Sequence, residues 1–441
     1  MLLIANGMVL TRDGGRFIAD GGVAIDGERI AAVGETEALR RAYPKAEYMD
    51  AKGKLIMPGL VNAHTHIYSA LARGMSIGGY APESFYDILD GLWWKLDRRL
   101  DLEATRCSAY ATLIDCIKQG VTTVFDHHAS YGSTAGSLFA IADVASELGV
   151  RACLCYEVSD RDGEAKCREA IAENVAFMEH CESLRSDMLK AMFGMHAAFT
   201  LSDSTMKECV RQNAGRVGFH IHVAEGMDDV RDSLDNYGVR TVRRLYDAGI
   251  MGEKSIFGHC VHIDEGEMEL IASTGTAVVN CPESNMGNAV GCSPVLELFG
   301  RGALVGLGTD AYTNDMLESL KVELAMQRHN AGKPNVAWSE SEAMLFDNNP
   351  RIAERHFGVP LGVLRPGAAA DVIVVDYKPF TPISGENAHG HILFGVTGRQ
   401  CDTTIVNGRV LMRGRELTGV DETSINERIT ESADALWRAI C

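Results

Sequence analysis

The fold is decided by residues 58–66, which read PGLVNAHTH. In this stretch a short apolar run leads into two histidines that are separated by one residue. Side chains two residues apart on a strand lie on the same side, so the imidazoles of His64 and His66 can hold one metal ion together. We therefore interpret residues 55–62 as a buried strand whose carboxyl end carries metal ligands.

Seven further apolar runs follow this strand, and segments of helical period separate them. The eight runs cover residues 55–62, 120–126, 150–156, 191–195, 217–222, 255–259, 276–280 and 302–309. Because helix-like segments such as residues 102–118 and 230–248 lie between them, the pattern predicts repeated βα units with a parallel sheet. A doubly wound open sheet is the alternative, but eight units favour a closed (βα)8 TIM-type barrel.

Both ends of the chain show shorter alternating runs with hairpin signals. Residues 4–10 and 23–33 contain Asn-Gly and Asp-Gly turns, and similar runs return at residues 370–376 and 404–411. We predict that the two ends build one small composite β-sandwich domain, with the barrel inserted between its halves. The predicted domains are residues 1–55 with 361–441 for the β-sandwich and residues 56–360 for the barrel.

Composition argues against several classes of function. The 441 residues include 42 Lys+Arg and 60 Asp+Glu, and the net charge of −18 argues against nucleic acid and anionic membranes as partners. The longest apolar runs are far shorter than the roughly 20 residues of a membrane-spanning helix, and the start lacks a basic signal-peptide segment, so we expect a cytoplasmic protein. The 12 cysteines are scattered without a Cys-x-x-Cys pair, so we expect mostly buried thiols.

Side chains of the types that bind metals end several of the other predicted strands. His222 and Glu225 follow the fifth strand, His259 ends the sixth, and Asp310 follows the eighth. Barrel enzymes place their active sites at the carboxyl ends of the strands, so these side chains should meet the first histidine pair. The predicted ligands of one divalent metal ion are His64, His66, His222 and Asp310.

These positions resemble the amidohydrolase superfamily over nearly the whole chain. The matching segments are residues 58–66, HVAE at 222–225, GHCVH at 258–262 and GTD at 308–310. Within the superfamily the chain is similar to the mononuclear aminohydrolase branch, which holds guanine and cytosine deaminases and triazine hydrolases, and most of all to the SsnA-like aminohydrolases. Further matches are LARG at 71–74, LWWKLD at 92–97, MH at 195–196 and CPESN at 281–285.

The resemblance implies a mechanism with a single metal ion, Zn²⁺ first and Fe²⁺ as the alternative. The fourth strand ends at His196, where two-metal relatives carry a bridging lysine. Asp310 would bind the metal and take the proton of its water, Glu225 would protonate a ring nitrogen, and His259 would orient the attacking hydroxide. The expected reaction is the release of ammonia from a purine, pyrimidine or related N-heterocycle.

Other residues are expected to shape the pocket. The predicted substrate contacts are His196, Trp94, Ser284 and Asn285. Trp94 lies in an aromatic loop with Tyr80, Phe85, Tyr86 and Trp93, which we expect to close over a flat heterocycle. We expect His220 to point away from the site and to be structural. Whether His127, His128 or His262 reach the pocket stays open.

Two other functions stay open at this point. The same residues could open a cyclic amide or displace a halide, or the chain could be a non-catalytic metal-binding relative of an enzyme. A relative that had lost catalysis should also have lost some of the catalytic residues. Glu225 and His259 are present beside the full set of predicted ligands, which argues against a non-catalytic protein. The resemblance also implies a homodimer or higher homo-oligomer and a small-molecule heterocyclic substrate.

Overall fold

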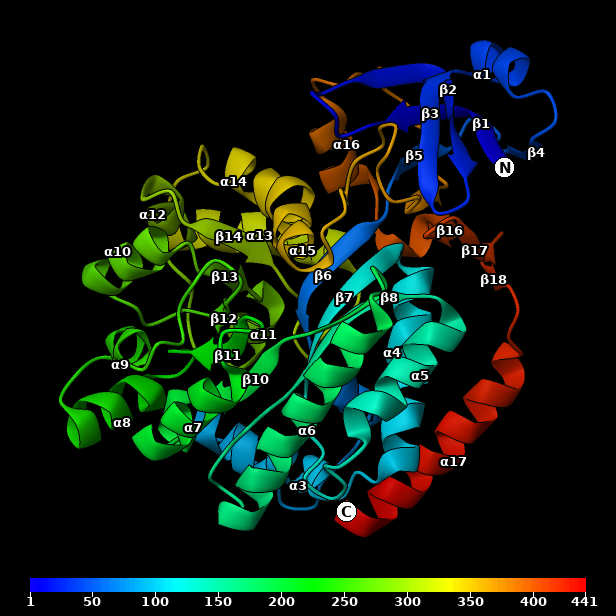
Figure 1. Ribbon diagram of the computed structural model, residues 1–441. Coiled ribbons are helices and arrows are strands. Elements are labelled where there is room, and N and C mark those ends of the chain that lie inside the picture. Colours follow the sequence, from blue (N-terminus) through cyan, green and yellow to red (C-terminus); the bar gives the residue numbers. More distant parts are fainter.

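The eight apolar runs form the parallel strands of a barrel in the computed structural model, which describes residues 1–441 (Figure 1). The barrel strands are β6 (Leu60–Thr65), β7 (Val121–His128), β8 (Arg151–Tyr156), β9 (Leu189–Ala191) with β10 (Phe193–Ala197), β11 (Phe219–Val223), β12 (Ile256–His259), β13 (Ala277–Asn280) and β14 (Leu304–Leu307). The prediction of a parallel (βα)8 barrel is confirmed.

Hydrogen bonding divides the barrel into two parallel sheets, β6-β7-β8-β9 and β10-β11-β12-β13-β14. The chain passes from the first sheet to the second at Met192, the single residue between β9 and β10. A parallel bridge between Val158, which follows β8, and Met195 of β10 connects the two sheets on this side of the barrel. At the other seam, the amides of Thr309 and Asp310 donate to the carbonyl of His64. These bonds join the two sheets on both sides and exclude a doubly wound open sheet.

Helices cover the outside of the barrel. They are α4 (Leu102–Lys118), α5 (Ser137–Leu148), α6 (Glu164–Leu184), α7 (Asp203–Asn213), α8 (Met227–Tyr237), α9 (Thr241–Asp247), α10 (Glu265–Thr274), α11 (Pro282–Gly287), α12 (Val295–Gly300), α13 (Met316–Ala331), α14 (Trp338–Ala343) and α15 (Asn349–Phe357). The predicted helix at 102–118 is confirmed. The segment 230–248 is instead two helices, because Gly238 adopts a φ of 72° and ends α8.

Strands from both ends of the chain pair in one nine-stranded mixed sheet. It contains β1 (Leu2–Leu10), β2 (Phe17–Asp26), β3 (Arg29–Glu35), β4 (Glu47–Asp50), β5 (Leu55–Pro58), β15 (Val372–Val375), β16 (Cys401–Val406), β17 (Arg409–Arg413) and β18 (Glu416–Leu417), with α1 (Thr36–Ala42) and α16 (Ala388–Gly395) beside it. The domain bounds stay a prediction, since α17 (Glu422–Ile440) leaves this sheet and packs on α4 (Figure 1).

The first predicted strand, residues 55–62, is in fact two strands. β5 pairs with β1 and β15 in the mixed sheet, whereas β6 belongs to the barrel. The chain passes between the two sheets at Gly59, where an added Cβ would lie 2.3 Å from Cγ2 of Thr122. Only glycine allows so close an approach, and the turn places His64 and His66 at the far end of β6.

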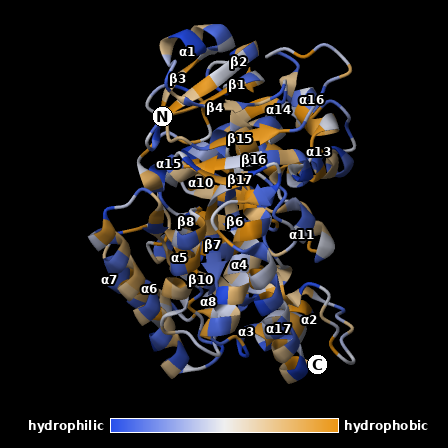
Figure 2. Ribbon diagram, turned by 90° about the vertical axis from the view of Figure 1, so that its right-hand side faces the viewer, coloured by the Kyte–Doolittle hydropathy of each residue, from blue (hydrophilic) through white to orange (hydrophobic).

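Apolar side chains fill the barrel and the layer between its strands and helices. Figure 2 shows this distribution, with orange concentrated on the strands and blue on the outer faces of many helices. All cysteines are free thiols, and all but Cys292 and Cys441 are buried, as expected. None of the helices combines the length and the hydropathy that crossing a bilayer requires.

A buried ion pair between Arg151 of β8 and Asp371 joins the barrel to the mixed sheet. The Arg151 side chain is 0% exposed, and Asp371 also accepts a hydrogen bond from the amide of Asn407 at 2.8 Å. Replacing Asp371 with Ala leaves the guanidinium buried without a counter-charge. We therefore expect Asp371→Ala to lower the free energy of unfolding by about 3–5 kcal/mol.

Urea denaturation of Asp371→Ala measures this loss. The control is Asp434→Ala, which removes the partner of Arg438 from an ion pair with both side chains more than half exposed. That change should cost less than about 1 kcal/mol. Equal stability of the two variants would contradict the claim that the Arg151–Asp371 ion pair stabilises the contact between the barrel and the mixed sheet.

Candidate metal centre and active site

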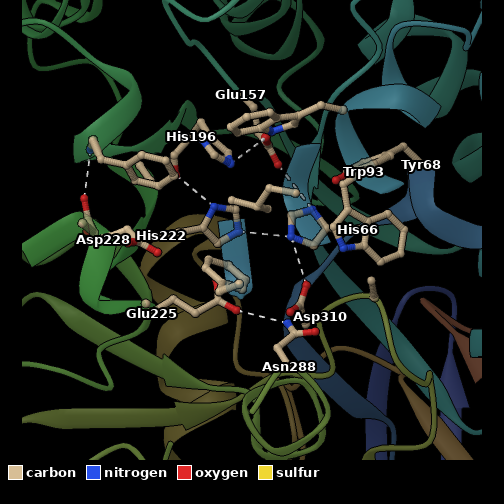
Figure 3. A pocket seen from close by; sticks show the side chains of 18 of the residues that line it. His66, Tyr68, Trp93, Glu157, His196, His222, Glu225, Asp228, Asn288 and Asp310 are labelled. Carbon is tan, nitrogen blue, oxygen red and sulfur yellow. Dashed lines mark hydrogen bonds and ion pairs between the residues drawn. The ribbon is translucent and has the colours of Figure 1, made fainter. Parts of the chain in front are cut away.

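The predicted metal ligands lie at the carboxyl ends of the barrel strands, and Figure 3 shows three of them, His66, His222 and Asp310, side by side. His66 Nε2 lies 3.1 Å from His222 Nε2 and 3.1 Å from Asp310 Oδ1, and His64 Nε2 lies 4.0 Å from Asp310 Oδ1. Two ligands bound at about 2.0–2.1 Å to one tetrahedral ion lie about 3.3 Å apart. The spacing of these atoms therefore fits a single ion.

In His66 and His222, the ring nitrogen that does not face the proposed metal donates a hydrogen bond to a backbone carbonyl. His66 Nδ1 lies 2.5 Å from the carbonyl oxygen of His127, and His222 Nδ1 lies 2.9 Å from the carbonyl oxygen of His196. Since a carbonyl only accepts, each Nδ1 carries the proton and each Nε2 presents its lone pair. His64 Nε2 is buried and has no hydrogen-bond partner. Three imidazoles and one carboxylate suit a divalent transition-metal ion.

Left-handed backbone at two strand ends directs side chains into this centre. His259, the last residue of β12, has a φ of 66°, and Asp310, three residues after β14, has a φ of 53°. Non-glycine residues adopt this conformation at a cost of about 1–3 kcal/mol. Strain of this kind is typical of positions that hold functional side chains.

The expectation for His220 was wrong. Residues 220 and 222 are two apart on β11, so their side chains share one face of the strand. His220 Nε2 lies 2.8 Å from His64 Nδ1, and its ring centroid lies 4.7 Å from that of His127. His220 is thus the partner that fixes the orientation of the His64 ring.

Replacing His220 with Phe should weaken metal binding, because the ring remains while the hydrogen bond to His64 is lost. We expect about a 10–100-fold loss of metal affinity, the usual effect of removing a group that orients a ligand. Competition with a chelating dye measures it. The control is His389→Phe, since His389 is also buried but has no hydrogen-bond partner at either ring nitrogen. Unchanged affinity in His220→Phe would show that His64 needs no support.

Glu225 lies beside the metal centre in contact with His259. Glu225 Oε2 is 3.3 Å from His259 Nε2, and Glu225 Oε1 accepts from Asn288 Nδ2 at 3.3 Å. Burial raises the pKa of Glu225 to about 7; the nearby Asp310 adds to the rise and His259 opposes it. A carboxyl group that titrates near neutral pH can both donate and accept a proton there.

A chain of side-chain hydrogen bonds fixes the orientation of His259. His259 Nδ1 lies 2.8 Å from Asn285 Oδ1, Asn285 Nδ2 donates to Asn280 Oδ1 at 2.8 Å, and Asn280 Nδ2 donates to Glu323 Oε2 at 2.6 Å. An amide oxygen only accepts, so the proton is on Nδ1 of His259. Nε2 of His259 is then turned toward Glu225, without a hydrogen-bond partner of its own.

Two residues predicted to contact substrate lie behind His259 and Asp310 instead of on the cavity wall. Asn285 and Ser284 are fully buried at the start of α11 and do not line the cavity. Asn285 holds His259, and Ser284 Oγ donates to Asp310 Oδ2. The structure therefore assigns both a supporting position in place of the predicted contact with substrate.

The cavity beside the metal centre is closed over by the aromatic segment. His196 and Trp94 lie on its wall with Phe85, Trp93 and Phe199, and its volume is about 50 Å³. An adjoining cavity of about 450 Å³ shares His66, Trp93, Asn288, Asp310 and Tyr312 with it. Ligand pockets usually measure about 300–1,000 Å³. The adjoining cavity falls within this range, and the smaller one lies below it. Part of the wall of the smaller cavity is formed by α2 (Phe85–Ile88), the π-helical turn Leu89–Trp93 and α3 (Trp94–Asp97).

Sequence reasoning missed Glu157 on the same wall. Its side chain is 4% exposed, with Oε1 3.0 Å from His127 Nδ1 and 3.5 Å from His66 Nδ1. Glu157 directly follows β8, so the rule that strand ends carry functional groups could have found it. His127 packs against the ligand rings without lining the cavity, and His128 and His262 do not line it either.

Comparison with known proteins places these features in a family. The model of the Amidohydrolase family matches residues 55–411, and that of the bacterial Imidazolonepropionase-like composite domain matches residues 21–46. The chain is 32% identical to the 5-methylthioadenosine/S-adenosylhomocysteine deaminase of Pelotomaculum thermopropionicum, over 96% of both chains. It is 29% identical to the 5′-deoxyadenosine deaminase of Methanobrevibacter smithii, over 95% of this chain and 94% of that protein.

A solved structure shares the fold along the whole chain. The adenosine deaminase of Xanthomonas campestris with bound zinc superposes with a TM-score of 0.87 and 22% identity, over 99% of this chain and 98% of that chain. The barrel and the mixed sheet together are therefore an architecture already known among hydrolytic deaminases.

Proposed function

The chain belongs to the amidohydrolase family, and we propose that it is a metal-dependent deaminase whose substrate is an adenosine-type nucleoside. It is a hydrolase that acts on C–N bonds. The observation that carries the proposal is the cluster of His64, His66 and Asp310, with His222 Nε2 3.1 Å from His66 Nε2, beside the carboxyl group of Glu225, whose pKa is raised to about 7. The substrate class is supported by the names of two curated relatives, a 5-methylthioadenosine/S-adenosylhomocysteine deaminase and a 5′-deoxyadenosine deaminase.

We propose Zn²⁺ as the metal, held by His64, His66, His222 and Asp310. Three imidazoles and a carboxylate match the ligands of catalytic zinc sites, although Fe²⁺ accepts the same set. When bound, the ion supplies Lewis acidity and lowers the pKa of a coordinated water to about 7.

The protein's own residues then move the protons. Asp310 accepts a proton from the attacking water, with Ser284 holding its other oxygen in place. Glu225 protonates the ring nitrogen beside the amino-bearing carbon, which makes that carbon more electrophilic. It then takes the proton of the newly added hydroxyl group and passes it to the leaving amino group, and the proton held by Asp310 restores the acid form of Glu225. His259, oriented by Asn285, stabilises the charge that develops at the attacking oxygen. A C–O bond forms, the C–N bond breaks, and ammonia leaves.

Ammonia release from a panel of compounds tests this function. Metal-loaded protein is incubated with adenosine, 5′-deoxyadenosine, 5′-methylthioadenosine, guanine, cytosine, a chlorinated triazine and a cyclic amide. We expect ammonia and the matching inosine-type product from the adenosines. Chloride release or ring opening without ammonia would replace the deaminase proposal by one of the other hydrolase reactions that the same residues could perform.

The chain is also proposed to form a homodimer or a higher homo-oligomer, as its resemblance to the aminohydrolases implies. Light scattering coupled to size-exclusion chromatography measures the assembly. A mass of one chain, 47.8 kDa, would contradict this part of the proposal.

A further inference from the structure

The carboxylates on the cavity wall restrict which substrates the site accepts. We propose that the site selects heterocycles whose substituent carries hydrogen-bond donors and no negative charge, and that Glu157 is the residue that enforces this choice. The inference rests on the proposed function and narrows its substrate class. It separates neutral adenosines from phosphorylated or carboxylated ones.

The wall of the cavity contains five acidic residues and three histidines, but no lysine or arginine. The carboxylates belong to Glu157, Glu225, Asp228, Asp229 and Asp310, and neither lysine nor arginine is among the lining residues. Burying an anionic group without a counter-charge is costly, and like charges beside it add to that cost. A phosphate or carboxylate on the substrate would therefore find no partner there.

Two arginines near the cavity form ion pairs with carboxylates. Arg161 lies over the ring of Trp94, with its guanidinium carbon 5.1 Å from the ring centroid, but it is paired with the buried Asp97. Arg73 lines the adjoining cavity, and its Nη2 lies 3.6 Å from Asp115 Oδ2. Arg161 would have to leave a buried ion pair to receive an anionic substituent, whereas the Arg73 side chain is 75% exposed and lines the adjoining cavity.

One oxygen of the Glu157 carboxylate can accept a hydrogen bond from a substrate. The Glu157 carboxylate is buried beside the imidazole of His127. Oε1 is occupied by His127 Nδ1 at 3.0 Å. His196 Nε2 lies 3.9 Å from Oε2, which is beyond hydrogen-bond distance. A hydroxyl or amino group of the substrate can fill that gap.

The position of Glu157 suits contact with the part of the substrate that does not react. Figure 3 shows Glu157 and Glu225 on opposite sides of the His66–His222 pair. A ring with its amino-bearing carbon at the metal centre and its nitrogen at Glu225 has its far side toward Glu157 and His196. In an adenosine that far side carries the sugar, whose hydroxyl groups are donors.

Three compounds that differ only at the 5′ position of the sugar test the proposal. These are adenosine, its 5′-amino-5′-deoxy analogue, which is cationic, and adenosine 5′-monophosphate. With metal-replete wild-type protein we expect kcat/KM for adenosine to exceed that for the monophosphate by about 100-fold, since an unpaired buried charge costs several kcal/mol. The amino analogue should react at least as well as adenosine.

Variants of Glu157 identify the residue responsible. Glu157→Gln removes the charge and should lower the ratio of kcat/KM for adenosine to kcat/KM for the monophosphate about tenfold. Glu157→Asp keeps the charge and should leave this ratio unchanged. The matched control is Asp228→Asn, because Asp228 lies on the same wall but its side chain is 43% exposed, and its effect should be smaller. Metal content and thermal unfolding of each variant show whether it is folded.

Several outcomes would overturn the proposal. Equal turnover of the monophosphate by wild-type protein would do so, as would an unchanged ratio in a folded Glu157→Gln protein. Turnover of the monophosphate that disappears in Arg73→Ala would show that the substituent lies in the adjoining cavity. If no compound yields ammonia, the proposed function fails. Calorimetry then measures the affinity of the protein for the same three compounds, and equal affinities would overturn the proposed charge preference.

Discussion

Glu225→Gln should lower kcat for ammonia release by about 10²–10⁴-fold, the usual contribution of a group that transfers protons in the transition state. Gln keeps the size of the side chain and can still contact Asn288, but it cannot donate a carboxylic proton to a ring nitrogen. Metal content should stay at the wild-type level, because Glu225 contacts His259 and not the proposed ligands His64, His66 and His222. Ammonia release and metal analysis of the same sample measure both properties.

A suitable control has a similar pKa but lies outside the cavity. Burial raises the pKa of Glu283 to about 7, and its carboxylate accepts from Ser319 Oγ at 2.5 Å on the outer side of α11. Glu283→Gln should retain turnover close to that of the wild type. If Glu225→Gln lost its metal together with its activity, Glu225 would have to be reassigned as a ligand.

Asp310→Ala should remove both metal binding and turnover. Asp310 Oδ1 lies 3.1 Å from His66 Nε2, and Oδ2 accepts from Ser284, so the change removes a ligand and a proton acceptor together. Metal affinity should fall at least as far as on loss of a group that only orients a ligand, about 10–100-fold. Excess metal should restore the metal content without restoring ammonia release.

His222→Ala is the matched comparison for Asp310→Ala. It removes a neutral ligand but keeps Asp310 as the proton acceptor, so excess metal should recover part of the activity. Titration of both variants with Zn²⁺, with metal content and ammonia followed together, separates the two roles. Full recovery of Asp310→Ala in excess metal would contradict the assignment of Asp310 as the acceptor of the water proton.

Much of the fold and of the ligand set was predictable because simple periodicities specify them. Eight apolar strands separated by helical segments indicate a barrel, and the position of ligands at strand ends follows from its geometry. The pair His64 and His66 is readable because residues two apart share one side of a strand. The same rule, applied correctly, would also have placed His220 beside His222.

The remaining errors concern features that tertiary packing decides. Ser284 and Asn285 lie where β13 gives way to α11, and the packing of that helix turns their side chains toward Asp310 and His259 instead of the cavity. Glu157 belongs to no recognisable motif, and only the folded barrel brings it beside His66, His127 and His196. The break of the first strand at Gly59 depends on its contact with Thr122, which is distant in sequence.

The most direct test of the account is a titration of metal-free protein with Zn²⁺ while ammonia release from 5′-deoxyadenosine is followed. One ion held by three histidines and Asp310 predicts that the rate rises from zero and reaches its plateau at one equivalent of metal per chain. Ammonia release by the metal-free protein, or a plateau only at two equivalents, would contradict the proposed single metal centre.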